Sequence, residues 1–446
     1  MKKLLSLILV ISLAICFTAC KKDKTSEPNT SEPSSEQSTP QESVENLDYT
    51  ITTEKDEYSV NEDQTLFISA NVVPNGNLIW TTSDDSVLSL NSAVGGVTIL
   101  AKKAGVVTLT ASCGNSSKTC QITVIPSSGE MIILENNQKD YAVEIGSSTS
   151  LDFGVYALSS DGTKTAVENA NITYSLSNEK IASVENGAIK GVRHGVLQVN
   201  AYYEDLVSSA SVTVYDKFIS NSSEWLTMLS SAKMGEYYML DSDIDFEGKT
   251  YTSYGADVKD DTTKAFRATL NGNGHTVKNI TLTGKSGTYV SVFGKLYNAK
   301  ISNLSIENVT VKGSNVKGGG IASVINGESS MIANVYLELT FEVTPENAGV
   351  IAYNYYGGTL NGILANVSTP IDNATSGKLS IIASIIGNVK ASAVYVLAEE
   401  EITSVGELKG YSSLIDMAWD VNSERKFDSN YWTYAGGKEL PTLNKK

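Results

Sequence analysis

Two stretches of this chain repeat each other, and this repeat limits the fold more than any other feature. Residues 78–87 match residues 172–181, and residues 105–111 match residues 195–201. Both copies are rich in Val, Ile, Thr and Tyr, alternate in polarity, and carry turn residues about every 8–12 positions. Alternation with period two puts every second side chain on one face of a strand. The sequence therefore predicts two β-sandwiches in tandem.

The two copies also share a large aromatic anchor on the first matched strand, Trp80 in one and Tyr174 in the other. With the polar turn that follows, this pattern resembles the bacterial immunoglobulin-like domains of group 2, which are common in surface proteins. The resemblance covers residues 47–126 and 129–215. It implies that each copy is an independently packed immunoglobulin-like sandwich.

Two cysteines lie near the end of the first copy. If Ala111 pairs with Ile122, Cys113 stands opposite Cys120, and both side chains point inward. A cross-strand disulfide between them is then expected outside the cytoplasm. The alternative is a pair of buried thiols that pack as small apolar side chains.

The N-terminus has the pattern of an export signal. Two lysines precede an uncharged, mostly apolar run at residues 4–17. A membrane-spanning helix needs about 20 such residues, so this run favours a signal peptide. Residues 17–20, Phe-Thr-Ala-Cys, resemble a bacterial lipoprotein signal, which implies removal of residues 1–19 and acyl chains on Cys20. The alternative is an ordinary cleaved signal with a chance cysteine.

A polar tether follows at residues 20–46. It is rich in Ser, Glu, Thr and Pro, and after the cysteine its single aliphatic side chain is Val44. Such a segment cannot bury enough apolar surface to offset its ordering entropy. We expect a disordered, solvated spacer.

The remaining part, residues 217–446, begins with a short helix and continues as a spaced repeat. Asn221 is a suitable N-cap for a helix over residues 222–233, with Glu224 at the third position. Small residues then follow apolar pairs at intervals of 28, 30 and 31 residues: Gly294, Ala322, Ala352 and Ala383. Short apolar strands at a near-constant period, without long helices between them, predict stacked coils.

Three segments of this part, residues 270–277, 318–322 and 349–354, resemble right-handed parallel β-helix modules of surface proteins, including those with GLUG repeats. The predicted fold class is therefore all-β: two immunoglobulin-like β-sandwiches, then a right-handed parallel β-helix with a short N-terminal capping helix. The final segment, which contains Trp432, is expected to cap the other end.

Composition argues against several functions. Asp plus Glu number 50 against 34 Lys plus Arg, a net charge of −16, whereas nucleic-acid phosphates attract basic surfaces. Three arginines and two histidines occur, His194 in a loop without an obvious partner and His275 in a turn typical of the module. No catalytic motif is found, so no catalytic residue is assigned and the chain is expected not to be an enzyme.

Tyrosines are the best candidates for ligand contact. Tyr353, Tyr355 and Tyr356 stand beside a Gly-Gly pair where a loop can leave the coil. Flat aromatic rings next to small residues stack on sugars or anchor a protein contact. The alternative is that these rings pack internally.

Alternating aspartates form a weak metal candidate. In a strand, Asp241, Asp243 and Asp245 would share one face and could bind Ca²⁺ through oxygen atoms. The alternatives are a solvated face, or aspartates that accept hydrogen bonds from turn amides. No other cofactor is expected.

Together these features predict an extracytoplasmic protein, anchored to the bacterial membrane through acyl chains and exposed at the cell surface. Its expected function is adhesion, with a glycan or a host or envelope protein as ligand and no nucleic acid. One alternative is a cell-surface lyase or glycoside hydrolase, which would need two close carboxylates. A second is a purely structural envelope spacer.

Overall fold

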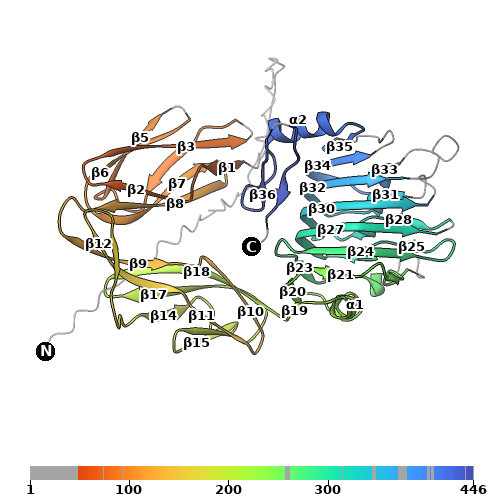
Figure 1. The fold of residues 1–446 in the computed structure, drawn as a ribbon, viewed down its shortest axis with the longest axis horizontal. Coiled ribbons are helices and arrows are strands. Elements are labelled where there is room, and N and C mark those ends of the chain that lie inside the picture. The colour runs from red at the N-terminus through yellow and green to blue at the C-terminus, as the bar shows by residue number, and fades with distance from the viewer. Residues whose placement is uncertain are drawn as a thin grey trace, which may run out of the picture. The chain divides into compact units, whose positions relative to one another are not determined.

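The structure, a computed structural model, describes residues 49–444 apart from 74, 94, 257–261, 314, 344–347, 370–378, 399–401, 403–405 and 437. The predicted signal peptide, Cys20 and the tether lie outside the described residues. The described part is mostly β, with sandwich-like sheets followed by a parallel β-solenoid and two short α-helices (Figure 1). This confirms the predicted fold class. Among the described residues, no helix is both long and apolar enough to cross a bilayer.

The first sandwich consists of two four-stranded sheets. One sheet has the order β1 (Thr50–Thr53), β3 (Thr65–Val73), β6 (Gly96–Ala101), β5 (Leu88–Ala93). The other has the order β2 (Glu57–Asn61), β8 (Ser116–Ile125), β7 (Gly105–Cys113), β4 (Ile79–Thr82). Inward side chains of both sheets form one apolar core that includes Trp80, as the alternating pattern requires.

The second sandwich has the same plan with one sheet divided in two. Its four-stranded sheet has the order β10 (Asp140–Glu144), β18 (Leu206–Tyr215), β17 (Gly195–Tyr203), β14 (Thr173–Leu176). The opposing strands form the sheets β13 (Lys164–Ala166), β12 (Phe153–Ser159), β9 (Glu130–Asn136) and β11 (Ser148–Ser150), β16 (Ala188–Gly191), β15 (Ala182–Glu185). A separate core fills the space between them.

Strand register shows that the sequence repeat is a structural repeat. Gly105 pairs with Val124 in the first copy, and Gly195 pairs with Val214 in the second. The aromatic anchor of each copy lies opposite an alanine on the neighbouring strand. In both copies the last strand also pairs in parallel with an early strand, β2 or β10.

The same register overturns the predicted disulfide. Cys113 pairs with Ser116 and Cys120 pairs with Leu109, and both thiols are buried and free. The tight turn after Cys113 sets this register, so the two cysteines lie four positions apart along the hairpin. Four positions span about 13 Å, well beyond the reach of a disulfide. Burial raises the pKa of the Cys120 thiol.

Where the structure describes the β-solenoid, its coils pair through parallel strands. Its longer sheet runs β19 (Lys217–Ile219), β20 (Tyr237–Leu240), β23 (Thr269–Asn271), β27 (Lys300–Lys312), β30 (Met331–Glu342), β32 (Thr359–Ser368), β34 (Lys390–Ala398), β35 (Leu408–Tyr411), with β21 (Ile244–Asp245), β22 (Thr250–Tyr251) and β24 (Thr276–Thr283) beside it. The second sheet contains β25 (Tyr289–Val290), β28 (Lys317–Gly319), β31 (Ala348–Tyr355), β29 (Ala322–Asn326), β26 (Lys295–Tyr297) and β33 (Ser380–Ile385).

Similar apolar side chains lie above one another in successive coils. Leu304, Val335, Ile363 and Val394 follow one another across four paired strands, and all are fully buried. Full burial of one such side chain stabilises the fold by about 1.5–3 kcal/mol. The interior of the solenoid, here called the lumen, is therefore a continuous apolar core.

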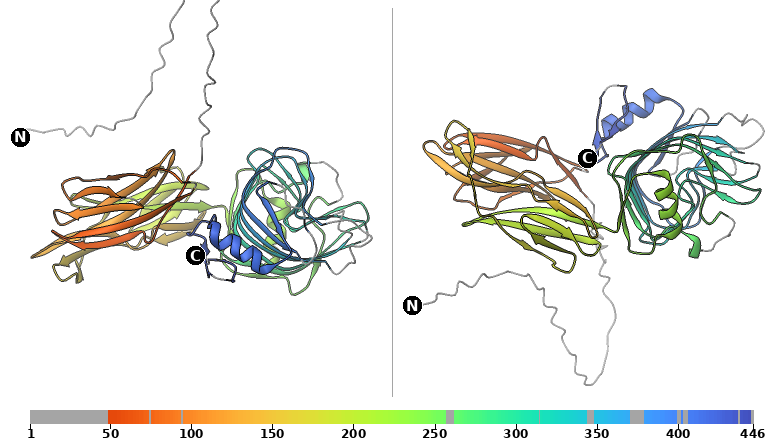
Figure 2. Two further views of the ribbon diagram at one scale, coloured as in Figure 1. Left: turned by 90° about the horizontal axis from the view of Figure 1, so that it is seen from above. Right: turned by 60° about the horizontal axis from the view of Figure 1, so that its bottom comes forward.

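The helix α1 (Ser222–Ser231) closes the first end of the lumen. Its N-cap Asn221 accepts a hydrogen bond from the Glu224 amide, as predicted. The buried side chains Trp225, Met228 and Leu229 belong to the lumen core. Figure 2 shows α1 lying across the opening of the solenoid.

The final segment does not cap the other end in the same way. Helix α2 (Leu414–Glu424) and the hairpin of β36 (Trp432–Thr433) and β37 (Thr442–Leu443) pack on outward-facing side chains of β32 and β34. We call this second apolar group the outer cluster; it comprises Leu364, Ala393, Tyr395, Met417, Val421, Phe427 and Trp432. The expectation of an end cap is therefore wrong. Side chains next to inward residues of a strand point outward. On β32 and β34 several of these outward side chains are apolar, and the final segment buries them.

Candidate functional site

The three candidate tyrosines do not share one exposed surface. Tyr355 is fully buried, and its hydroxyl donates a hydrogen bond of 2.7 Å to the Gly358 carbonyl. Tyr353 and Tyr356 are half-buried. Tyr355 therefore packs internally and does not offer its ring to a ligand, whereas Tyr353 and Tyr356 retain accessible surface.

Tyr353 belongs to an aromatic–cation cluster that sequence reasoning missed. Its ring meets the Tyr289 ring edge-on, with centroids 6.1 Å apart. The Lys317 ammonium lies 5.2 Å from the Tyr289 ring centre and 5.5 Å from that of Tyr353. Tyr289 and Lys317 are stacked partners on neighbouring coils. Knowledge of the coil register is needed to see this, because the three residues are far apart in the sequence.

Two of the three candidate aspartates, Asp243 and Asp245, accept hydrogen bonds from residues in or beside nearby turns. Asp243 accepts from the Thr276 amide at 3.0 Å and contacts His275 Nδ1 at 3.0 Å. Asp245 accepts from the Asn279 side chain at 2.8 Å and from the Glu247 amide at 2.7 Å. These hydrogen bonds, the Asn279 amide first, hold the pKa of Asp245 below its usual range.

This arrangement agrees with the alternative to a metal site, in which the aspartates accept hydrogen bonds from turn amides. Residues 241–243 are also outside any strand, so the three side chains do not alternate on one strand face. Among the described residues, no three His, Cys, Asp or Glu side chains gather closely enough to hold a metal ion. Calcium at this position therefore has no supporting geometry in the described part of the chain.

A ladder of asparagines runs along the solenoid. The Asn303 amide donates to Asn271 at 2.9 Å, and the Asn334 amide donates to Asn303 at 3.1 Å. Asn303 and Asn334 have φ values of 56° and 53°. Asparagine tolerates this left-handed conformation better than other non-glycine residues do. Asn303 and Asn334 therefore let the chain turn at the same position of two successive coils. The ladder joins their side chains to each other and to Asn271.

Each end of the ladder contacts another part of the chain. The Trp432 indole N–H donates to Asn334 at 3.3 Å, and the Asn271 amide donates to the Tyr215 hydroxyl at 3.1 Å. The ladder thus touches both the outer cluster and the last strand of the second sandwich.

The junction between that strand and the solenoid is a polar cluster around Asp216. Its carboxylate lies 3.0 Å from His194 Nδ1 and accepts from the Tyr237 amide at 2.7 Å. The His194 ring stacks on the Tyr237 ring with centroids 5.5 Å apart. Phe218 also donates its amide to Glu144 at 2.9 Å. His194, which the sequence left without a partner, therefore joins the sandwich loop to the first coils.

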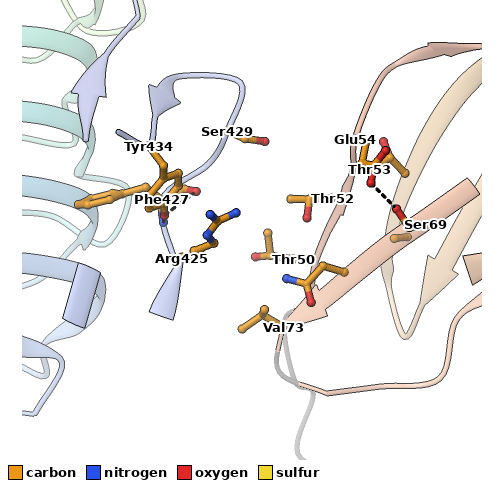
Figure 3. A pocket seen from close by; sticks show the side chains of 12 residues that line it. Thr50, Thr52, Thr53, Glu54, Ser69, Val73, Arg425, Phe427, Ser429 and Tyr434 are labelled. Carbon is orange, nitrogen blue, oxygen red and sulfur yellow. Dashed lines mark hydrogen bonds between the residues drawn. The ribbon is translucent and has the colours of Figure 1, made fainter. Parts of the chain in front are cut away.

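A pocket of about 400 Å³ combines strand residues with residues of the final segment (Figure 3). On one side stand the hydroxyls of Thr50 and Thr52, and on the other stand Arg425 and Tyr434. The Arg425 guanidinium carbon is 5.4 Å from the Tyr434 ring centre. Hydroxyl, guanidinium and aromatic groups can bind a polar ligand.

Comparison with known proteins does not assign a family. No family model and no curated protein matches the chain. Among solved structures, S-layer protein SbsC domains 5-6 match at 17% identity over 38% of this chain and 97% of that chain, with a TM-score of 0.17. Protocadherin Gamma B7 extracellular cadherin domains match at 18% identity over 38% and 52%, with a TM-score of 0.16. Human Protocadherin-24 EC1-2 matches at 16% identity over 39% and 99%, with a TM-score of 0.16. At these TM-scores the likeness carries no argument.

Proposed function

We propose that this chain is a lipid-anchored bacterial surface protein that binds a glycan or a protein and does not catalyse a reaction. In this proposal, acyl chains on Cys20 hold the protein on the membrane, and residues 20–46 form the tether. Two group 2 immunoglobulin-like sandwiches then carry the β-solenoid. The signal-like N-terminus and the polar tether composition support this order.

The filled lumen is the observation that carries the binding role. Apolar side chains occupy the interior of the solenoid from α1 to β35, so ligands must bind on outer surfaces. Those surfaces offer half-buried tyrosines, hydroxyls and isolated cations, which suit sugar hydroxyls and polar protein groups.

The test is a binding survey with the full chain on a glycan array and on a panel of surface proteins. We expect at least one ligand, and we expect Tyr353→Ala to weaken binding if the aromatic–cation cluster is the contact. Tyr202→Ala is the matched control, because Tyr202 is a half-buried tyrosine on the second sandwich. Failure to bind any glycan or protein would contradict the proposed function.

The enzyme alternative is tested separately. Incubation of the full chain with polysaccharides should produce no new reducing ends or unsaturated products. Product formation that is lost on changing a single carboxylate would refute the non-catalytic proposal.

The anchor has its own test in cells. Cys20→Ala should release the protein from the membrane fraction into the medium, because alanine has no thiol to carry the acyl chains that hold the protein on the membrane. Retention of the variant in the membrane would contradict lipid anchoring.

A further inference from the structure

A groove where the second sandwich meets the solenoid gathers positive charge from distant parts of the chain. Its volume is about 740 Å³, within the usual range for ligand sites. Two of the three arginines of the chain, Arg193 and Arg267, line it together with Lys300. His194 also lines it, and its ring contacts the Asp216 carboxylate. No Asp or Glu is among the lining residues. In a protein of net charge −16, this is a local reversal of charge.

The polar groups of the solenoid wall are aligned by the coil register. Thr269 pairs with Lys300, and Lys300 pairs with Met331 on the next strand. Two positions before each of these residues stand Arg267, Asn298 and Ser329, and all three line the groove. Paired strands are about 4.8 Å apart. The lining therefore follows three successive coils along the solenoid axis rather than converging on one point.

Another part of the lining comes from the loop of the second sandwich that holds Arg193 and His194. Asp216 holds His194, and Tyr237 stacks on it, so the loop is attached directly to the first coils. Arg193 and Lys300 are exposed, and neither forms an ion pair among the described residues. Their charges are therefore available to a ligand.

We propose that this groove binds a linear acidic polysaccharide through its carboxylate or sulfate groups. This inference rests on the proposed function and names the ligand class for it. Cations and amide or hydroxyl donors in a row match a polymer with an anionic group on successive units. An aromatic pair beside them, His194 on Tyr237, offers a flat surface to a sugar ring.

The observations favour a polysaccharide over a nucleic acid. Nucleic acids present closely spaced phosphates and need many basic contacts, whereas this groove has few cations and lies in an acidic protein. Neutral sugar hydroxyls between anionic groups also suit the uncharged donors Asn298, Ser329 and Thr269.

The test measures binding of four probes to the full chain at low and physiological salt. Polygalacturonate presents carboxylates, dextran sulfate presents sulfates, dextran is the neutral polymer, and an oligothymidylate strand represents nucleic acid. We expect binding to polygalacturonate or dextran sulfate, with the stronger of the two identifying the anionic group. Binding to dextran and to the oligothymidylate should be weaker, and binding to the acidic polymer should fall as salt rises.

Charge-matched variants locate the site. Arg193→Gln with Lys300→Gln should weaken acidic-polymer binding by about tenfold or more, because two charge-assisted contacts are lost. Lys103→Gln with Lys285→Gln changes the net charge equally at exposed positions away from the groove and should have less than about twofold effect. Thermal unfolding should be the same for both variants.

Three results would overturn the inference: no binding to either acidic polymer, equal losses in the two double variants, or oligothymidylate binding as tight as polysaccharide binding. If the protein binds a neutral glycan or a protein and the groove variant binds it normally, the groove inference fails and the proposed function stands. If no ligand of any kind is bound, both fail.

Discussion

The two helices of the solenoid region have similar N-caps and each has a buried face, but they pack on different surfaces. Each has a polar N-cap whose side chain accepts an amide hydrogen bond, Asn221 for α1 and Ser413 for α2, and each buries three side chains. Those of α1 complete the lumen core, whereas Met417 and Val421 of α2 join the outer cluster. An amphipathic pattern therefore predicts that a helix packs, but it does not predict on which face of a solenoid.

The difference has an energetic consequence. The lumen core is continuous from coil to coil, so damage at α1 is expected to spread through the stack. The outer cluster is a separate group on one face, so its loss should remain local. Four predictions test this contrast.

The largest effect is expected at the closed end. Trp225→Ala removes a fully buried ring from the lumen core and should lower the free energy of unfolding by about 3–5 kcal/mol. Urea unfolding followed by circular dichroism measures the change. Leu226→Ala is the control, because Leu226 is 39% exposed. Equal losses in the two variants would contradict a lumen-closing role for α1.

A smaller and local effect is expected at the outer cluster. Trp432→Ala removes a ring that is 1% exposed and stacks on Phe427 at 4.6 Å. Hydrogen exchange should rise across residues 414–444, while β27 and β30 stay protected. Trp419→Ala, at a tryptophan that is 73% exposed, should change neither region. Loss of protection throughout the solenoid would show that the two cores are not separable.

The asparagine ladder should contribute less to the stability of the fold than either Trp225 or Trp432. Asn303→Ala loses two ladder hydrogen bonds and puts alanine at a φ of 56°, so we expect a loss of about 2 kcal/mol. Asn303→Gly keeps the left-handed conformation and loses the hydrogen bonds alone, so about 1 kcal/mol is expected. Thermal or urea unfolding of both variants separates the two contributions. If glycine were as harmful as alanine, the backbone conformation would not matter.

Low pH should slightly destabilise the segment that packs on the outer cluster and should leave the lumen core unchanged. Burial raises the pKa of the Glu424 carboxyl, but hydrogen bonds from Lys409 and Tyr395 outweigh burial, so its pKa is lowered overall. A lowered folded pKa stabilises the fold above the ordinary value of about 4.3, and this contribution is lost as the pH falls through the folded value.

Hydrogen exchange of residues 414–444 at pH 7 and at about pH 3, corrected for intrinsic rates, measures this effect. We expect a decrease in protection at low pH in the native chain and a smaller decrease in Glu424→Gln, which has no carboxyl to titrate. The same decrease in both proteins would assign the acid effect to other groups.

Much of the fold followed from local patterns. Alternation and the matched turns predicted both sandwiches, and the register of Gly105 with Val124 and of Gly195 with Val214 confirms their equivalence. Apolar segments of constant period predicted the stacked coils, and Asn221 was placed at the start of α1. These features depend on neighbours within a few residues or on a repeated spacing, and the sequence displays both directly.

The tertiary structure decided what depends on register and on contacts between distant segments. Cys113 and Cys120 are separated because one tight turn sets the pairing, and Tyr355 is internal although Tyr353 retains exposed surface. Arg193 and Arg267 line one groove across 74 positions of sequence. Side-chain type and period determine which residues are buried in a strand or helix, whereas the stacking of whole coils and sheets determines which surfaces face each other.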